Sequence, residues 1–594
     1  MKELEEYYTD IQIIKNLCRH RAKMSHARHK KHMLRDISKH NKTNKIHVSQ
    51  SHPDFLKIQK LFPTRRNWKK LNKKERLCPN RLNNSIEKNT ERLWKSYSVE
   101  KILVEKDGKV PDEWYINLLF FCSNIREKVN GIFDGSYFIN KPEIFSIYKS
   151  FKQEKGKHIY RPIAQYSLED KIITSGFAKY LTEVFDQTFL DCSFAFRARK
   201  NNTVPSHHDS IVQILKYKKK NKRLWVSECD IQKFFDTVQH EYLISIFFEE
   251  IKKLKQNGVK ITSKVKKIFL NFLNSYSFNR DVLPKNNDLT FFKEDHEFGW
   301  NMKELKAEFG ENYTKKFKIG VPQGNAVSCF IANLILNRVD QSVLEKHKDI
   351  LYVRYCDDMI IAHPNRKVCK EALETYKLNI KKCFLLFHEP KKFENYEENG
   401  KYFWTFKSKE PYYWGNKFNG INNVPWLSFV GYQINYKREI RVRKDSINKE
   451  IKKQISETQK VLVAIGMDHK QNLSKISTFS RKSKRQLIFS LQQRLISMST
   501  GRVTIYNYNN KNFKQDLCWS NGFRLLNKNK IAKYQLKKLD NRREQQISYF
   551  KNQISNLEVE NNNKDERPAY MKKQKFFFGK PFSYSNLLES KVDT

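Results

Sequence analysis

Residues 349–363 read DILYVRYCDDMIIAH and place two acids, Asp357 and Asp358, between two apolar runs. This pattern predicts a β-hairpin with the acids at its tip. Upstream, residues 223–231 read RLWVSECDI and predict a buried strand that ends at a third acid, Asp230. Carboxylates are costly to bury near each other unless a cation neutralises them, so the pattern indicates a cation site.

The chemistry of such a site follows from its ligands. Oxygen ligands with spare valences suit Mg²⁺, which keeps waters and substrate phosphates in its shell, and Mn²⁺ would fit as well. Two such ions about 4 Å apart can activate an attacking 3′-hydroxyl and stabilise the leaving pyrophosphate. Each acid taken singly is better explained as a turn residue or a cap, so a phosphoryl-transfer site is predicted only from their order and context.

The chain around these acids alternates strand and helix patterns. Two extended segments are expected at residues 145–166, around a turn at 155–157. A turn and a long apolar helix are expected at 320–343, and a strand at 427–435. Further helices are expected at 168–189, 240–254 and 370–387, and from about residue 436 onward. The mixture predicts an α+β fold.

Positive charge is the main feature of the composition. The 594 residues include 114 Lys and Arg against 64 Asp and Glu, a formal net charge of +50. The usual reason for such a charge is a polyanionic partner, most often nucleic acid. Residues 11–50 hold eleven basic residues and one acid, Asp36. This clustering favours nucleic-acid binding over a lysine-rich composition alone, and we expect strongly salt-dependent RNA binding through residues 11–50.

Neither the cysteines nor the apolar residues indicate export or membrane insertion. The ten cysteines have no CxxC spacing, which argues against a disulfide framework and a cysteine-based zinc site. The N-terminus has no apolar signal region, and the chain has no run of about 18 apolar residues. A soluble cytoplasmic protein with reduced thiols is expected.

The two ends of the chain carry weaker signals. Residues 1–100 predict short helices and loops that depend on a partner for order, with His29 and His32 on a solvated basic face. Near the other end, an apolar spacing predicts a coiled-coil seam or, equally, an amphipathic helix packed on its own domain. This spacing consists of Ile547, Phe550, Ile554 and Leu557. The tail after about residue 560 is expected to be loose.

Six blocks of sequence together resemble the reverse transcriptase family, and within it the bacterial branch of group II intron, retron and phage-defence enzymes. The blocks are RPIAQYSLEDKII (161–173), CSFAFRARKN (192–201), CDIQKFFDTV (229–238), GVPQGNAVSCFIANL (320–334), VRYCDDMIIA (353–362) and LSFVGYQI (427–434). The Asp-Asp block alone is weak evidence. The blocks in this order are specific.

The resemblance implies a right-hand polymerase with helical, basic extensions at both ends. The implied parts are an N-terminal extension (1–100), fingers (101–222), a palm (223–435), a helical thumb (436–525) and a C-terminal helix and tail (526–594). The palm would contain insertions at 257–318 and 395–425. The second insertion includes YFWTFKSKEPYYWGNKF (402–418), which predicts a platform for stacking bases or a β-hairpin that buries its own aromatics.

The same resemblance implies roles for individual residues. Asp230 and Asp357 would hold both metal ions, with Asp358 close by and the Ile231 carbonyl as a further ligand. Other matched positions are Arg161 for the triphosphate, Phe235 (or Phe234) as a steric gate against a ribose 2′-hydroxyl, Gln323 and Gly324 beside the nucleotide, Tyr355 and Cys356 under the primer end, and Lys391 (or Lys392) as a general acid. Cys329 and Cys356 stand where the family often has Pro and Ala, and both are small enough to be tolerated.

These features predict an RNA-directed DNA polymerase with an RNA template, dNTPs, a DNA product and a primer of nucleic acid or protein. No H-N-H or zinc-type endonuclease pattern follows the predicted thumb, which favours antiphage defence with a noncoding RNA over a mobile intron protein. The alternatives are an intron maturase or retron enzyme, template-independent nucleotide addition, and a non-catalytic RNA-binding protein. A homo- or hetero-oligomer is compatible with the sequence but not required by it.

Overall fold

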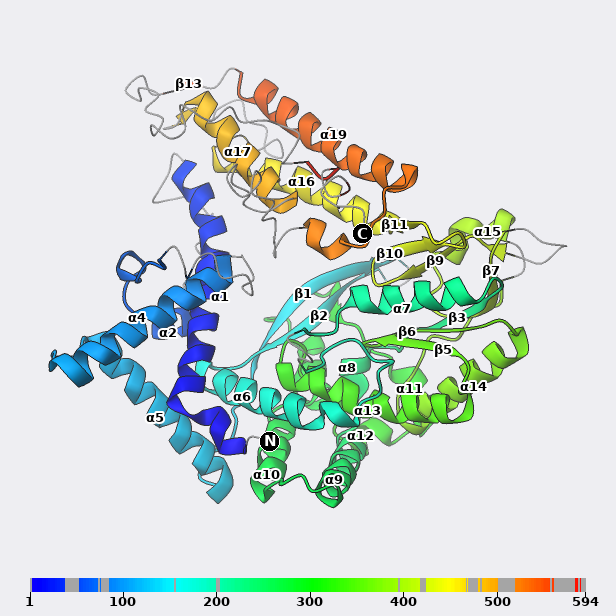
Figure 1. Cartoon of the computed structure of the whole chain (residues 1–594), viewed down its shortest axis with the longest axis horizontal. Helices are drawn as coiled ribbons and strands as arrows, with labels where there is room; N and C mark the ends of the chain where they lie inside the picture. Colours follow the sequence, from blue (N-terminus) through cyan, green and yellow to red (C-terminus); the bar gives the residue numbers. More distant parts are fainter. Residues whose placement is uncertain are drawn as a thin grey trace. The chain divides into compact units, whose positions relative to one another are not determined.

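The structure, a computed structural model, divides into two compact units (Figure 1). The first unit contains Met1–Leu17 and Tyr115–Val430, and the second contains Cys18–Trp114 and Gly431–Thr594. The structure describes residues 3–37, 53–72, 75, 85–153, 156–198, 203–393, 396–416, 423–465, 467, 479–480, 483–499, 519–555, 558–559, 583–585 and 588. All three predicted catalytic acids lie in the first unit.

A five-stranded sheet in the order β5-β6-β3-β7-β8 carries these acids. Its strands are β3 (Trp225–Cys229), β5 (Leu351–Tyr355), β6 (Asp358–His363), β7 (Lys409–Trp414) and β8 (Asn423–Val424). The first four strands in this order are antiparallel, and β8 joins β7 in parallel. The predicted hairpin is therefore confirmed, and its second arm, β6, pairs directly with the acid-terminated strand β3.

Helices pack against this sheet and against each other (Figure 1). Helix α14 (Arg366–Lys382) contacts β3, β6 and β7, and it also packs on α13 (Ala326–Lys346). The α13 side chains are buried on nearly every face, as expected for a helix that lies among other elements. The unit also contains η1 (Leu4–Tyr8), α5 (Glu113–Asp134), α6 (Leu168–Phe185), η4 (Asp186–Thr188), α7 (His207–Lys220), α8 (Phe234–Thr237), α9 (His240–Gln256), α15 (Tyr396–Phe403) and β9 (Trp426–Phe429).

A second sheet of the first unit has the order β1-β2-β4. Strands β1 (Glu143–Lys152) and β2 (Lys157–Gln165) form the predicted antiparallel pair. Strand β4 (His296–Phe298) comes from the insertion at 257–318 and pairs in parallel with β2. The insertion also forms α10 (Ser263–Asn274), η5 (Phe278–Val282), η6 (Leu283–Asn287), α11 (Met302–Phe309) and α12 (Tyr313–Lys316). The insertion thus completes a sheet that begins more than 100 residues earlier in the chain.

The second insertion does not form the predicted hairpin, and three of its aromatic rings are not available for the predicted stacking platform. Strand β7 pairs with β3 in the main sheet and with β8 in parallel, so the segment is not a hairpin. The rings of Phe403, Tyr412 and Trp414 are buried, and the Tyr412 hydroxyl donates to Glu228 Oε1 at 2.6 Å. Buried rings have no face free for a base, so the stacking platform is wrong for these three residues.

The predicted strand at 427–435 is interrupted. Strand β9 ends at Phe429, and β10 (Tyr432–Asn435) begins three residues later. Between them, Val430 and Gly431 have φ angles of 41° and 87°. Two successive residues in the left-handed region cannot continue an extended strand, which explains the break.

Long helices replace the short N-terminal helices that the sequence predicted. Helix α1 (Asp10–Ile37) has 28 residues and α4 (Ser85–Asp107) has 23, although α2 (Pro53–Lys60) and η2 (Arg65–Asn67) are short. Tertiary packing stabilises a helix whose sequence is mostly polar, because the few apolar side chains of α1, such as Ile14 and Leu17, are fully buried. Residues 38–50 and the side chains of His29 and His32 lie outside the described part of the chain.

The second unit contains a bundle of three helices. Helices α16 (Lys444–Ala464), α17 (Lys484–Ser499) and α19 (Lys530–Gln553) pack on one another. Ile547, Phe550 and Ile554 lie in the same buried cluster as residues of α16 and α17. The amphipathic-helix interpretation of this spacing is therefore confirmed, and Leu557 lies outside the described residues. The unit also contains β10, β11 (Ile440–Val442), β12 (Phe479–Ser480), η7 (Trp519–Phe523) and β13 (Glu558–Val559).

The expectation of a loose C-terminal tail is wrong at Tyr584. Its side chain is fully buried, and its hydroxyl donates to Glu450 Oε1 at 2.7 Å. The Tyr584 backbone N–H donates to Asp540 Oδ1 at 2.7 Å. The polar composition of the tail concealed this aromatic residue, which contacts α16 and α19.

None of the helices in the described ranges combines the length and the apolar character needed to cross a membrane.

Candidate active site

The turn between β5 and β6 holds the first two acids. Tyr355 pairs with Asp358, so Cys356 and Asp357 form a two-residue turn. Cys356 has a φ of 60°, a left-handed conformation that two-residue hairpin turns require at this position. Asp357 therefore lies at the tip of the hairpin, and Asp358 begins β6.

Strand pairing brings Asp230 to the same place. Cys229 pairs with Met359, so Asp230 lies one position beyond this pair, across from Asp358. Residues that face each other in an antiparallel pair have Cα atoms about 4.5–5.5 Å apart. The Asp230 backbone is held on both sides, because its N–H donates to Ser408 Oγ and its carbonyl accepts from the His388 N–H, both at 2.9 Å. The structure thus gathers all three predicted acids.

The carboxylates interact electrostatically. Burial raises the pKa of Asp357 above its usual value, and the negative charge of Asp230 raises it further. The ionised form of Asp357 is therefore costly in the folded protein. A bound divalent cation would remove this cost, because it favours the charged form of both carboxyl groups.

These residues fit an Mg²⁺ ion, although they do not form a complete cage. Within the described ranges, no group of three or more His, Cys, Asp or Glu side chains is arranged to hold an ion. Mg²⁺ typically takes only one or two carboxylates and completes its shell with water and substrate phosphates. The pair of Asp230 and Asp357, with the electrostatic cost described above, matches this requirement.

Lys407 is a functional candidate that the sequence analysis missed. Its Nζ lies 3.3 Å from Asp230 Oδ2 and 2.9 Å from His388 Nε2. Burial lowers the pKa of His388, and the charge of Lys407 lowers it further. The predicted Lys391 has an exposed side chain, and its backbone N–H donates to the Ser408 carbonyl at 3.2 Å. Lys407 could not be found from a motif because it lies in the second insertion.

Burial distinguishes the two phenylalanines that were predicted as candidates for the steric gate. Phe234 is buried in the core, whereas Phe235 is only half-buried, so Phe235 is the better candidate of the two. The Phe235 carbonyl accepts from the Val321 N–H at 2.7 Å, which joins the gate to the Pro-Gln-Gly segment. The gate role itself stays a prediction.

A buried acid positions the predicted glutamine. Gln323 Nε2 donates to Asp236 Oδ1 at 2.7 Å, and the Gln323 carbonyl accepts from the Ala164 N–H of β2 at 3.1 Å. Burial raises the pKa of Asp236, and the nearby Lys233 opposes this shift. Gly324 follows with a φ of 101°, a conformation that favours glycine. Asp236 lies in the quoted block at 229–238, but the resemblance implied no role for it.

Two cations of the β1-β2 pair face this region. Arg161, the predicted triphosphate ligand, is exposed on β2. Burial lowers the pKa of Lys149, the charge of Arg161 lowers it further, and the charges of Asp230 and Asp236 oppose the shift. Lys149 therefore lies within electrostatic reach of Arg161 and of Asp230, one of the three predicted catalytic acids.

A fully buried ion pair supports the catalytic hairpin. Arg354 and Asp340 have side-chain exposures of 0% each, and Arg354 Nη2 lies 2.6 Å from Asp340 Oδ2. Arg354 Nη1 also donates to the Cys356 carbonyl at 3.0 Å, inside the turn that carries Asp357. The guanidinium thus ties the turn to helix α13. Arg354 lies within the apolar run that predicted a strand, so the sequence pattern did not indicate this role.

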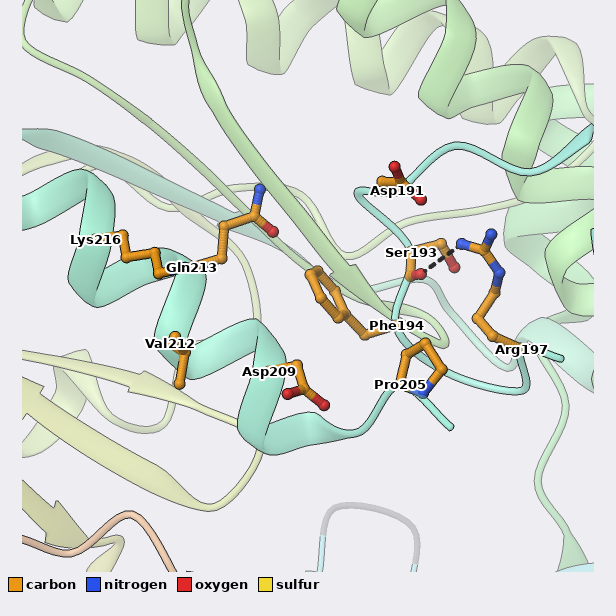
Figure 2. A pocket seen from close by; sticks show the side chains of 9 residues that line it. All are labelled: Asp191, Ser193, Phe194, Arg197, Pro205, Asp209, Val212, Gln213 and Lys216. Carbon is orange, nitrogen blue, oxygen red and sulfur yellow. Dashed lines mark hydrogen bonds between the residues drawn. The ribbon is translucent and has the colours of Figure 1, made fainter. Parts of the chain in front are cut away.

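A cavity of about 380 Å³ lies between the 192–201 block and the first turns of α7 (Figure 2). Figure 2 shows Asp209, Gln213 and Lys216 along α7 on one side and Phe194 on the loop. Arg197 lies behind the loop, where its Nη1 donates to the Ser193 carbonyl at 2.8 Å and its Nε pairs with Asp186 at 2.7 Å. Because Arg197 is buried in these contacts, it shapes the loop.

Comparison with known proteins identifies the class of this region. Residues 151–415 match the family described as "Reverse transcriptase (RNA-dependent DNA polymerase)". The match identifies these residues as a reverse transcriptase domain. Five of the six blocks quoted above lie inside the matched range, and the block at 427–434 lies beyond it.

The curated relatives and solved structures are distant. The group II intron-encoded protein LtrA of Lactococcus lactis subsp. cremoris is 23% identical over 228 residues, which is 38% of this chain and 29% of that protein. One solved structure is telomerase from Candida albicans in complex with a fragment of telomeric RNA. The superposition includes 75% of this chain and 68% of the telomerase chain, at 11% sequence identity and a TM-score of 0.32. For apo telomerase from Candida tropicalis, the superposition includes 77% of this chain and 68% of the telomerase chain, at 13% sequence identity and a TM-score of 0.31.

The Asp357→Asn variant tests the cost of the buried charge. A raised folded-state pKa means that this group contributes stability at low pH, which is lost as the pH rises through that pKa. Without metal at pH 8, we expect Asp357→Asn to melt above the wild type, by roughly 2–4 °C for each kcal/mol of relieved cost. Adding Mg²⁺ should raise the melting temperature of the wild type more than that of the variant. Equal increments in thermal-shift measurements would contradict this interpretation.

The Lys407→Met variant tests the ion pair with Asp230. Because Lys407 competes with a metal ion for the same carboxylate, its removal should lower the Mg²⁺ concentration for half-maximal thermal stabilisation. The pair is partly exposed, with side-chain exposures of 55% and 24%, so we expect a change of only about 1.5- to 5-fold. Lys407→Arg retains the charge, and Lys391→Met removes a lysine elsewhere, so both should behave as the wild type. An increased Mg²⁺ requirement in Lys407→Met would refute the competition.

Proposed function

We propose that this protein is an RNA-directed DNA polymerase that adds dNTPs to a primer by two-metal-ion catalysis. The observation that carries the proposal is the strand pairing that gathers Asp230, Asp357 and Asp358 within the reverse transcriptase domain. The alignment with the intron-encoded relative includes only 29% of that protein. The activity is therefore proposed from the site of this chain and not from the relative.

In this proposal, Asp230 and Asp357 hold two Mg²⁺ ions, with Asp358 and the Ile231 carbonyl as further oxygen ligands. Mn²⁺ would suit the same oxygen donors. When bound, such ions activate the primer 3′-hydroxyl and stabilise the leaving pyrophosphate. The protein holds the Asp230 backbone through Ser408 and His388, which limits movement of its carboxylate.

The surrounding residues would bind and orient the nucleotide. Arg161 and Lys149 supply positive charge to the triphosphate, since both lie on the β1-β2 pair near the acids. The Phe235 ring would exclude a ribose 2′-hydroxyl. Gln323, held by Asp236, and Gly324 would lie along the nucleotide. Tyr355 and Cys356 would lie under the primer end. Lys391 would donate a proton to pyrophosphate, and Lys407, which contacts Asp230, is the alternative donor.

The remaining parts of the chain would handle the nucleic acid. We assign the fingers to 101–222, the palm to 223–435 and the thumb to 436–525, with extensions at 1–100 and 526–594. Helices α16 and α17, which lie in this range and pack on each other, support a helical thumb, and α19 of the C-terminal extension packs on both. The cluster of basic residues at 11–50 supports RNA binding by the N-terminal extension.

Sequencing the product tests this proposal. The purified chain is given a defined RNA template with an annealed primer, Mg²⁺ and four dNTPs. A product complementary to the template supports the proposal, whereas a homopolymer or a repeat supports template-independent addition. RNA binding without any product in Mg²⁺ or Mn²⁺ supports a non-catalytic protein. As a further arm, Phe235→Ala should accept ribonucleotides more readily than Phe234→Ala, which is expected to disturb the core.

For the biological role, we propose bacterial antiphage defence with a noncoding RNA template in the cytoplasm. Support comes from the resemblance to the bacterial branch and from the long chain segments outside the reverse transcriptase domain. Bacteria that express the gene with its flanking DNA should resist phage, and Asp357→Ala should abolish this resistance. An upstream inverted-repeat RNA gene would instead favour a retron enzyme, and a surrounding structured intron would favour a maturase.

A further inference from the structure

We propose that the β1-β2-β4 sheet binds unpaired RNA through a ladder of rings on one of its faces. The aromatic ladder consists of Tyr148 and Phe151 on β1, His158 and Tyr160 on β2, and His296 and Phe292 from the 257–318 insertion. The proposal deepens the polymerase function above, because it assigns a surface for template that is not paired with a primer.

Strand register places the rings of the aromatic ladder on one face. Tyr148 pairs with Tyr160, and Phe151 pairs with His158 after an irregularity between Tyr148 and Ser150. His158 pairs with His296 in the parallel register of β4. His158 and Tyr160 are two residues apart on one strand, so their side chains leave the sheet on the same side. The irregularity in β1 allows both Tyr148 and Phe151 to reach this side.

The rings touch in a continuous series across three strands. The Phe151 and His158 ring centroids are 4.8 Å apart, and those of His158 and His296 are 5.0 Å apart with an interplanar angle of 22°. Tyr160 contacts Tyr148 at 5.7 Å and His296 at 5.0 Å. The carboxylate of Asp295 lies near both imidazoles, 2.7 Å from His296 Nδ1 and 3.6 Å from His158 Nε2.

The outer part of the ladder is open to solvent. Tyr148 and Phe151 are 54% and 49% exposed, whereas Phe292 at the other end is 6% exposed. A hydrophobic core would cover both ends. Aromatic rings that are fixed by neighbours on one side and exposed on the other offer faces on which bases can stack.

The opposite face of the same sheet carries Arg161, the predicted triphosphate ligand. Ile147 pairs with Arg161, and both alternate with the ladder residues along their strands. Arg161 and Lys149 interact electrostatically with each other, and Lys149 also interacts with Asp230. The ladder is therefore separate from the surface proposed for the triphosphate, although the two share strands.

The positive charge of the sheet favours a nucleic acid as its partner. Strands β1 and β2 carry Lys149, Lys152, Lys157 and Arg161 against Glu143, and β4 adds one acid, Glu297, which pairs with Lys157. A basic sheet with exposed aromatic rings has the two features that bind single strands, namely attraction for phosphates and stacking for bases. The sheet also leads directly into the reverse transcriptase domain, so RNA is the strand expected there.

Fluorescence anisotropy with a labelled oligouridine of about a dozen nucleotides tests the ladder in the full-length chain. Tyr148→Ala and Phe151→Ala should each weaken binding by about 5- to 150-fold, as expected for loss of one stacked base. Tyr148→Phe and Phe151→Tyr retain a ring and should bind as the wild type. Ile147→Ala is the matched control, because Ile147 is equally exposed at 54% but lies on the opposite face.

Unchanged affinity in both alanine variants at an unchanged melting temperature would overturn the proposal. An equal loss in Ile147→Ala, or ladder-dependent binding of oligothymidine but not of oligouridine, would overturn it as well. Primer extension separates this proposal from the polymerase function. If the wild type extends primers and the ladder variants bind oligouridine normally, only the ladder is refuted. If the wild type extends no primer but binds oligouridine through the ladder, only the polymerase function is refuted.

Discussion

Asp230→Ala and Asp357→Ala should each lower the rate of primer extension by about 10³-fold or more, because losing ~4 kcal/mol of transition-state stabilisation slows a reaction by this factor. The physical reason is that each carboxylate is proposed to hold the ions that stabilise the leaving pyrophosphate. Extension of a labelled primer on an RNA template measures the effect.

Asp349→Ala is the matched control for these variants. It removes the same charge from the other end of the hairpin, where the Asp349 side chain is exposed and only its backbone carbonyl accepts from the Tyr217 hydroxyl. This variant should extend primers at the wild-type rate. RNA binding should survive in all three variants, because the acids oppose binding to phosphates. Wild-type extension by Asp230→Ala or Asp357→Ala would exclude the proposed site.

Arg354→Ala should destabilise the first unit by about 3–5 kcal/mol, the usual cost of leaving one partner of a buried ion pair without the other. Asp340 would remain fully buried, with only the Tyr352 hydroxyl among its present partners left to donate to it. The loss should appear as a lower urea midpoint and as faster hydrogen exchange of the β5 and β6 amides.

A double variant separates stability from activity. Arg354→Met combined with Asp340→Leu removes both charges, and apolar replacements of this kind often restore stability. The double variant still lacks the hydrogen bond from Arg354 to the Cys356 carbonyl. We therefore expect stability to recover while primer extension stays impaired, because the turn that carries Asp357 has lost its anchor. Full recovery of extension would show that the guanidinium acts only through stability.

The catalytic hairpin was predictable from sequence because it is local. The two apolar runs around Asp357 and Asp358 pair with each other across a two-residue turn, so pattern and structure coincide. The β1-β2 pair and the helices α6, α9, α13 and α14 were predicted for the same reason, since each forms from residues close in the chain. Arg161, Phe235 and Gln323 were found by resemblance, and their roles stay predictions.

The residues that the sequence did not indicate act across long distances in the chain. Lys407 reaches Asp230 from 177 positions away, as part of an insertion without a motif. Strand β4 reaches β2 across an interval of 138 residues, between His158 and His296. Such pairings depend on the packing of the whole unit, and no local spacing encodes them.

The sequence by itself was enough to predict a polymerase site, because the order of its blocks and the strand and turn patterns around its acids are local features of the chain. Tertiary structure alone decided what surrounds that site. The ammonium of Lys407 at Asp230, the buried Arg354–Asp340 pair under the turn and the third strand beside β2 all arise from folding. The physical reason is that hydrophobic periodicity and turn preferences act over a few residues, whereas buried charges and sheet edges are satisfied by whatever the fold brings near them.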